Sequence, residues 1–222
     1  MHYVYTTNII FDHIKTDEIV MDKFNNKYRI PSARLQYWDY AAMGAYFITI
    51  CTKHKIHFFG NITNGAMQLT PLGSIVQQEW LKTFELRTDM ALTMGAFVVM
   101  PNHFHAIVII GANAYNTGDG GGWDATRCRD AMRGNSTKTG DTDAMHGVSA
   151  FAPQSKNLAS LVRRFKSAVT THARKMGDSD FNWQPRYHDH IIRDTASFDT
   201  IQQYIVNNPA KWDADTFNVH LL

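Results

Sequence analysis

The sequence predicts an α+β protein with a ferredoxin-like antiparallel sheet and helices packed on one face of it. Short runs of β-branched and aromatic residues alternate with longer amphipathic stretches, in the order strand, helix, strand, strand, helix, strand, helix. The 222 residues, of which 44% are hydrophobic, suffice for one good-sized core. No apolar run approaches the ~20 residues that a membrane span needs.

The first half of the chain carries the signals of a strand, a hairpin and a helix. Residues 46–52 are rich in β-branched and aromatic types, which is typical of a strand. Within 58–69, the pair Asn64-Gly65 favours a two-residue hairpin turn. Helical spacing predicts a helix over 71–86. Its buried face is expected to comprise Leu72, Ile75, Val76, Trp80 and Leu81.

The second half predicts three more strands and two more helices. The strands are expected over 92–100, 105–110 and 187–193. A cationic amphipathic helix over 156–175 precedes the last of them. The final helix is expected to end at Asn208, because Pro209 disfavours helical dihedral angles in the residue before it.

Composition divides the chain into four stretches. Residues 1–30 are polar and mixed, and we expect a partly ordered lead-in there. The first part of the domain follows over 31–110. Glycine and small polar residues dominate 111–155, which predicts a flexible insertion. The second part of the domain then covers 156–222.

Charge is small overall but unevenly distributed. The net charge is +2, yet 156–175 holds six Lys and Arg residues and no Asp or Glu, so this segment carries +6 and the remainder −4. A helix with one apolar face and one cationic face is a plausible phosphate-binding surface. The expected nucleic-acid contacts are Lys156, Arg163, Arg164, Lys166, Arg174, Lys175, Arg186 and Arg193.

Two histidines lie two residues apart in an apolar stretch. His103 and His105 flank Phe104, and Phe97–Val99 and Ile107–Ile110 enclose them. Side chains at i and i+2 share one face of a strand, so the two imidazoles project together. Such a pair is half of a metal site.

Tyr204 and Asn208 are four residues apart on the last predicted helix, and therefore share a face. An amide oxygen can coordinate a metal, and a tyrosine can act as a nucleophile once its hydroxyl is deprotonated. The sequence thus provides Tyr204 as candidate catalytic residue and His103, His105 and Asn208 as candidate metal ligands.

These motifs together resemble a known family. The Pro-Asn-His-Phe-His segment at 101–105 is similar to the His-hydrophobic-His motif of single-tyrosine transposases, and 204–212 is similar to their nucleophile helix. More narrowly, the chain resembles the REP-associated tyrosine transposases and small insertion-sequence transposases. The resemblance also includes the segments 31–35, 44–52, 183–187 and 190–193.

The resemblance implies an activity and a substrate. It implies metal-dependent nicking and strand transfer on single-stranded or hairpin DNA, through a 5′-phosphotyrosine and a free 3′-hydroxyl. Mg²⁺ or Mn²⁺ is the expected cofactor, with Zn²⁺ left open. Other readings are a replication-initiator or relaxase-type endonuclease, a silent DNA-binding regulator, and a hydrolase that uses water. A monomer is expected rather than a homodimer.

Two rival assignments of the site stay open. His188-Asp189-His190 is a second His-x-His segment and could hold the metal or contact DNA. Tyr187 could be the nucleophile, although no metal-type ligand follows it four residues later.

Cysteine usage and the N-terminus favour a cytoplasmic setting. Cys51 and Cys128 lack the spacing of a metal-binding pair. The first residues lack the pattern of a signal peptide.

Overall fold

The computed structural model describes residues 23–24, 27–28, 38–116 and 155–218. The chain divides into two units, 1–35 and 36–222. In the first unit, β1 (Lys23–Phe24) and β2 (Lys27–Tyr28) form a two-stranded antiparallel pair. The expected lead-in over 1–30 and the insertion over 111–155 lie largely outside the described residues.

The second unit is built on a four-stranded antiparallel sheet. Its strands are β3 (Gly44–Cys51), β6 (Leu92–Val99), β7 (His103–Ile110) and β8 (His188–Ile192). Their order in space is β6-β7-β3-β8. With α1 (Pro71–Leu86) after β3 and α3 (Leu158–Met176) after β7, the strands and helices follow the βαββαβ order of ferredoxin-like folds. The predicted fold class is confirmed.

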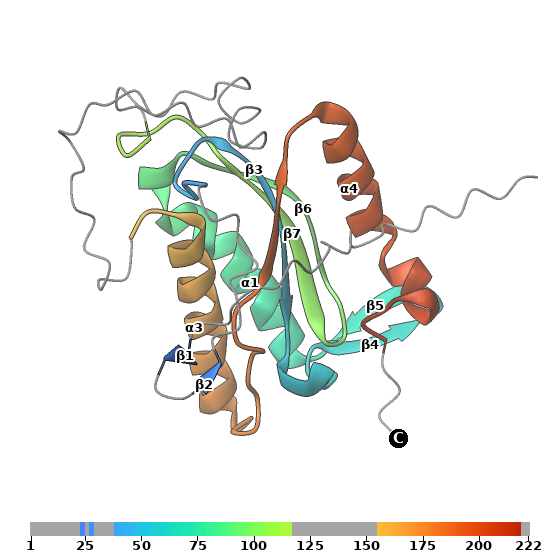
Figure 1. The fold of residues 1–222 in the computed structure, drawn as a ribbon. Coiled ribbons are helices and arrows are strands. Elements are labelled where there is room, and N and C mark those ends of the chain that lie inside the picture. The colour runs from blue at the N-terminus through green and yellow to red at the C-terminus, as the bar shows by residue number, and fades with distance from the viewer. Residues whose placement is uncertain (1–22, 25–26, 29–37, 117–154, 219–222) are drawn as a thin grey trace, which may run out of the picture. The chain divides into compact units, whose positions relative to one another are not determined.

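The main core lies between the sheet and the helices α1 and α3, which pack against each other (Figure 1). Alternate residues of β7 face this core, beginning with Phe104. The Trp80 ring of α1 packs edge-on against Phe104 at 4.9 Å and against Phe165 of α3 at 5.3 Å between centroids. Edge-to-face packing of this kind suits the aromatic quadrupole.

The other face of the sheet carries α4 (Thr195–Asn207), which stands apart from α1 and α3 in Figure 1. Ile205 of α4 is buried with Ile107 of β7 and Ile192 of β8 in a second, smaller cluster. The expected packing of helices on one face therefore holds for α1 and α3, whereas α4 packs on the other face because Ile205 is buried there. The His103 and His105 face is the one that α4 covers.

Local signals in the sequence explain where the helices begin. Thr70 accepts a hydrogen bond from the Gly73 N–H and caps α1. Asn157 and Ser160 form a reciprocal capping box at α3. Asp194 caps α4 by accepting from the Ser197 N–H.

Helix α4 ends at Asn207 with Asn208 as its C-cap, in agreement with the expected end, but the backbone of Asn208 differs from the expectation. Asn208 keeps helical dihedral angles, and Pro209 begins a 3-10 turn, η3 (Pro209–Ala214), directly after α4. Proline suits the first position of a helical segment because its missing N–H would have no partner there. Helical backbone geometry therefore continues from α4 through Asn208 into η3.

The predicted hairpin is confirmed as β4 (Gly60–Thr63) and β5 (Ala66–Leu69). Asn64 and Gly65 both have positive φ, 52° and 72°, which is the requirement of a type I′ turn. Two short 3-10 turns, η1 (Lys53–Lys55) and η2 (Thr88–Met90), complete the described elements.

Candidate active site

The site begins on β7, where His103 and His105 share the sheet face beneath α4. Both are buried, with 0% and 1% of their surface exposed, and their ring centroids lie 4.5 Å apart. Burial lowers the pKa of His103 well below 6.5 and that of His105 to about 3. The two imidazoles are therefore neutral at pH 7 and can offer lone pairs.

Asn102 determines which nitrogen of His103 carries the proton. Its amide nitrogen donates to the carbonyl oxygens of Lys55 at 3.0 Å and Phe217 at 2.8 Å. This fixes the amide orientation and turns its oxygen toward His103 Nδ1, at 2.8 Å. Since Nδ1–H must then donate, Nε2 is the unprotonated nitrogen. Among the described residues, this buried Nε2 has no hydrogen-bond partner.

His105 connects two strands and α4. Its Nδ1 lies 2.8 Å from the hydroxyl of Thr49, its partner in register on β3. Its Nε2 lies 3.3 Å from the hydroxyl oxygen of Tyr204. The side chain is therefore held from both ends, with one nitrogen facing the candidate nucleophile.

Tyr204 is half-buried between α4 and the sheet. Its ring lies 5.3 Å from that of His105 and 6.2 Å, edge-on, from that of Phe47. Burial raises the pKa of Tyr204 to about 12; nearby Asp215 also raises it, while a hydrogen bond with Asn208 opposes the increase. In this state the hydroxyl stays protonated at neutral pH.

Asn208 follows Tyr204 by one helical turn and is 3% exposed. Its side chain hydrogen-bonds with Tyr204 and with Asp215, just beyond η3. Its Oδ1 is buried and has no partner within the described part of the chain. Asp215 in turn accepts from the Phe217 N–H at 2.7 Å.

The donor set fits a divalent metal. His103 Nε2 and Asn208 Oδ1 are buried acceptors without a proton donor, which is unusual unless something else occupies them. With His105 Nε2 they form a nitrogen and oxygen set that suits Mn²⁺ or Zn²⁺ and, less well, Mg²⁺. Among the described residues, no group of three His, Cys, Asp or Glu side chains is suited to a metal, so the amide of Asn208 is the candidate third ligand.

Cys51 lies opposite His103 in the β3–β7 register. Burial raises the pKa of its thiol to about 11, so the thiol is protonated at neutral pH.

The rival residues lie elsewhere. Tyr187 packs against the main core, on the sheet face opposite the histidine pair. His188 and His190 project to the same face as His103 and His105, but they lie on β8, beyond β3, and are exposed. The structure thus brings together Tyr204, His103, His105 and Asn208 and leaves these three apart.

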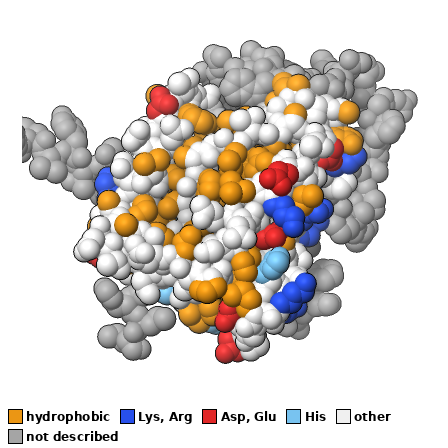
Figure 2. All heavy atoms as spheres, turned by 180° about the vertical axis from the view of Figure 1, so that it is seen from behind, with side chains coloured by type: hydrophobic (Ala, Val, Ile, Leu, Met, Phe, Trp, Pro, Cys, Tyr) orange, Lys and Arg blue, Asp and Glu red, His pale blue; other side chains and the backbone are white. Residues whose placement is uncertain are grey.

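Part of the predicted cationic surface lines a groove between α1 and α3. Arg163 and Arg164 line a cavity of about 520 Å³ together with Arg87. The remaining lining residues are small or carry hydroxyl groups: Ser160, Ser167, Ala168 and Thr171. Figure 2 shows most of the Lys and Arg side chains of the face it draws on one side, with Asp and Glu side chains among them, whereas much of that face is apolar or uncharged.

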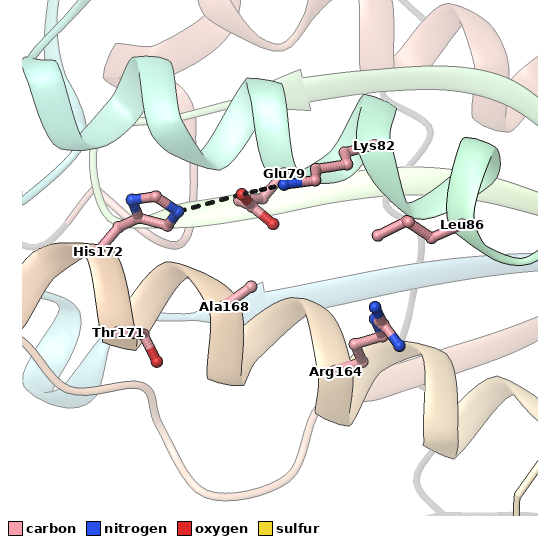
Figure 3. A pocket seen from close by; sticks show the side chains of 7 residues that line it. All are labelled: Glu79, Lys82, Leu86, Arg164, Ala168, Thr171 and His172. Atoms are coloured by element: carbon pink, nitrogen blue, oxygen red, sulfur yellow. Dashed lines mark ion pairs between the residues drawn. The ribbon is translucent and has the colours of Figure 1, made fainter.

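The groove continues into a smaller cavity of about 260 Å³, drawn in Figure 3. There Glu79 of α1 pairs with Lys82 at 3.9 Å and faces His172 of α3 at 3.3 Å. Leu86 and Arg164 lie at the other end of this cavity (Figure 3). Both cavities belong to the α1–α3 side of the sheet, opposite Tyr204.

The side chain of Lys166 hydrogen-bonds with the backbone of the same unit. Its Nζ donates to the carbonyl oxygens of Gln184 at 2.8 Å and Arg186 at 3.0 Å, which holds the segment before β8. Burial lowers its pKa to about 8. Only one of its three donor positions is left by these two bonds.

The other predicted cationic contacts are spread around the unit. Lys156 lies over the Tyr115 ring at 3.5 Å. Arg174 and Lys175 are exposed in the last turn of α3. Arg186 and Arg193 are exposed just before and just after β8.

Sequence reasoning missed Asn102, Thr49, Asp215 and Arg87. Asn102 is adjacent to His103, so an amide beside a metal-type histidine was an available signal. The other three residues are brought to their sites by contacts between distant segments. No local sequence pattern marks their positions.

Comparison with known proteins identifies the family. No family model matches the chain. A protein of Haemophilus influenzae described as uncharacterized is 36% identical over 192 residues, which cover 85% of this chain and 92% of that protein. The chain belongs to the same family as this Haemophilus influenzae protein.

The comparison with solved structures also found matches to this chain, two of which are the following. One is a REP-associated tyrosine transposase bound to a REP hairpin, with 19% identity, a TM-score of 0.48, and coverage of 82% of this chain and 74% of that chain. The other, from Deinococcus radiodurans, is described as a transposase and has 16% identity, a TM-score of 0.32, and coverage of 79% and 97%. Within the residues of this chain that the structure describes, no helix has the length and apolarity needed to cross a membrane.

Proposed function

We propose that the protein is a metal-dependent enzyme that nicks and transfers single-stranded DNA through a 5′-phosphotyrosine at Tyr204. The observation that carries this proposal is the convergence of the Tyr204 hydroxyl, His105 Nε2 and the two partnerless acceptors on His103 and Asn208. The motif resemblance gives the direction of cleavage and the substrate class.

A phosphodiester repels nucleophiles because it is anionic. His103, His105 and Asn208 would hold the divalent ion, which when bound supplies positive charge next to a phosphoryl oxygen. The strand and helix that carry these ligands are packed against each other, so the ligand set is preorganised.

The remaining chemistry belongs to Tyr204. Its oxygen attacks phosphorus in line, forms the phosphotyrosine ester and releases the 3′-hydroxyl of the neighbouring nucleotide. Its proton first passes to solvent water, and the Asn208 hydrogen bond stabilises the resulting phenolate. The 3′-oxygen that leaves takes up a proton from water, so the step is balanced. Because one ester replaces another, a 3′-hydroxyl can reverse the step and join strands without ATP.

We further propose hairpin DNA as the form in which the substrate is held, with the duplex phosphates along the groove of Arg87, Arg163 and Arg164. Arginine and hydroxyl side chains are the usual donors to DNA phosphates. A hairpin is also the form of DNA that the motif resemblance implies. We expect a cytoplasmic monomer.

The test is a denaturing gel of the protein with labelled hairpin oligonucleotides whose single-stranded flanks are randomised, in Mn²⁺ and Mg²⁺. The proposal predicts a metal-dependent band of protein–DNA adduct that Tyr204→Phe abolishes. Tyr187→Phe is the matched control, because Tyr187 packs on the opposite sheet face, and it should leave the band unchanged. Cleavage without a band would assign the attack to water, and an adduct that persists in Tyr204→Phe would refute the nucleophile.

A further inference from the structure

Within the described part of the chain, α4 covers only part of the sheet face that carries the candidate site. α4 packs mainly on β6 and β7, at one side of the sheet, whereas β3 and β8 lie at the other side. On β8, His188 and His190 are exposed, and on β3 Phe47 is half-buried. This part of the face therefore offers aromatic side chains next to Tyr204.

The strand register fixes which residues share this face. Phe47 lies opposite His190 on β8 and opposite Ile107 on β7, and directly paired residues project to the same side. Ile107 belongs to the cluster beneath α4, so Phe47 and His190 are on the Tyr204 side. His188, two residues before His190, shares that side as well.

Ring contacts extend from the site toward β8. Phe47 stacks on His105 at 5.3 Å with an angle of 28° between the planes, and it meets Tyr204 edge-on at 6.2 Å. Phe47 is thus the neighbour of the nucleophile on one side and the cross-strand partner of His190 on the other. A base placed here would lie directly beside the attacked phosphate.

Charge around this surface favours an anionic strand. Arg186 and Arg193 are exposed just outside the two ends of β8. Asp189, the acidic residue within β8, pairs with Ile48, whose side chain belongs to the main core, so it projects to the other face. Burial and Arg193 lower the pKa of His190, which keeps its ring neutral and suited to stacking.

We propose that Phe47 and His190 form a stacking platform for the unpaired base next to the phosphate that Tyr204 attacks, with His188 contacting the next base. This inference rests on the proposed function and adds the residues that hold the single-stranded part of the substrate. Aromatic side chains between basic groups are the general means of holding unpaired bases, and sheets of four strands use their open face in this way.

The test is fluorescence anisotropy without metal, so that no cleavage occurs, with a hairpin oligonucleotide that carries a randomised single-stranded tail. His190→Ala should weaken binding about five- to fifty-fold, and His190→Phe should retain it because it keeps a planar ring. The same hairpin without the tail should bind both variants equally. His172→Ala is the matched control, because His172 lies on α3 at the other sheet face. It should not alter the gain in binding affinity that the tail provides.

A tail of abasic sites separates stacking from a structural effect. Abasic sites in the tail should weaken binding by the wild-type protein as much as His190→Ala weakens binding to a tail with normal bases. His190→Ala should bind the abasic tail no more weakly than the wild type does. If His190→Ala binds the tailed hairpin as tightly as the wild type while wild-type protein forms the Tyr204 adduct, the platform is refuted and the proposed function stands. If the wild type neither binds the tail nor forms an adduct, both are refuted.

Discussion

The hydroxyl oxygen of Tyr204 lies 3.3 Å from Nε2 of His105, although 99 positions separate the two residues in the chain. The contact exists because β7 turns His105 toward α4 while α4 packs its apolar side on the same sheet face. It also means that the phenol and a metal would compete for one nitrogen.

That competition predicts the effect of removing the hydroxyl on metal affinity. Tyr204→Phe should bind Mn²⁺ about two- to ten-fold more tightly than the wild type, because a neutral hydrogen bond contributes about 0.5–1.5 kcal/mol. Isothermal titration calorimetry of the DNA-free protein measures this. Tyr187→Phe serves as the control with unchanged affinity, and weaker binding by Tyr204→Phe would show that the hydroxyl helps to hold the ion.

Asn102 should tune the metal site through His103. Asn102→Ala removes the acceptor that keeps the proton on Nδ1, so the ring loses its fixed tautomer and orientation. We expect a 10- to 100-fold loss of Mn²⁺ affinity, as for other partners of metal-binding histidines. Calorimetry with the exposed Asn61→Ala as control measures it, and an unchanged affinity in a folded Asn102→Ala protein would contradict the assignment.

The two buried histidines predict a pH dependence of stability. Their pKa values are lowered in the folded protein, so below pH 6.5 the unfolded chain binds protons that the folded one does not. The contribution of these two histidines to the free energy of unfolding is therefore complete above pH 6.5. It falls as the pH decreases toward the pKa values of the folded state. Each histidine should contribute a slope of about 1.4 kcal/mol per pH unit well below 6.5.

Urea unfolding of the metal-free protein between pH 7 and pH 4.5 measures this slope. In His105→Gln one of the two contributions is missing, and the slope should be smaller by about 1.4 kcal/mol per pH unit. Equal slopes in the two proteins would mean that His105 is protonated in the folded state.

Trp80 should be among the most important residues for stability. It is fully buried and packs against Phe84, Phe104 and Phe165, which connects α1, β7 and α3. Trp80→Ala should lower the free energy of unfolding by about 3–5 kcal/mol. The neighbouring Leu81 is 39% exposed, so Leu81→Ala is the control and should have a much smaller effect, contrary to the expectation that Leu81 belongs to the buried face.

Arg163 and Arg164 should contribute to hairpin affinity by neutralising phosphates. Replacing both by Ala should weaken binding and reduce the slope of log K against log salt by about 0.9 for each phosphate that is no longer neutralised. Lys82→Ala is the control, because Glu79 already partly neutralises Lys82. An unchanged slope in the double variant would place the duplex elsewhere.

Much of the fold could be predicted because its signals are local. Thr70, Pro71 and the apolar spacing that follows define α1, and Asn64-Gly65 defines the hairpin turn. The alternation around Phe104 placed the two histidines on one face. These features depend on residues a few positions apart, where propensity and periodicity act directly.

What escaped prediction depends on contacts between distant segments. The face on which α4 packs follows from Ile107, Ile192 and Ile205 coming together, which no short pattern encodes. The same holds for Asp215 beside Asn208, and for the two backbone carbonyls to which the Nζ of Lys166 donates. Within the site, the residue types were predictable, and the hydrogen bonds that orient them were not.

Covalent attachment of Tyr204 to DNA can be detected by mass spectrometry. The protein is incubated with Mn²⁺ and the hairpin pool, digested with nuclease and protease, and its peptides are sequenced by tandem mass spectrometry. We expect one modified peptide, with a nucleotide attached through its 5′-phosphate to Tyr204. A nucleotide on Tyr187 or another residue, or cleaved DNA with an unmodified Tyr204 peptide, would contradict it.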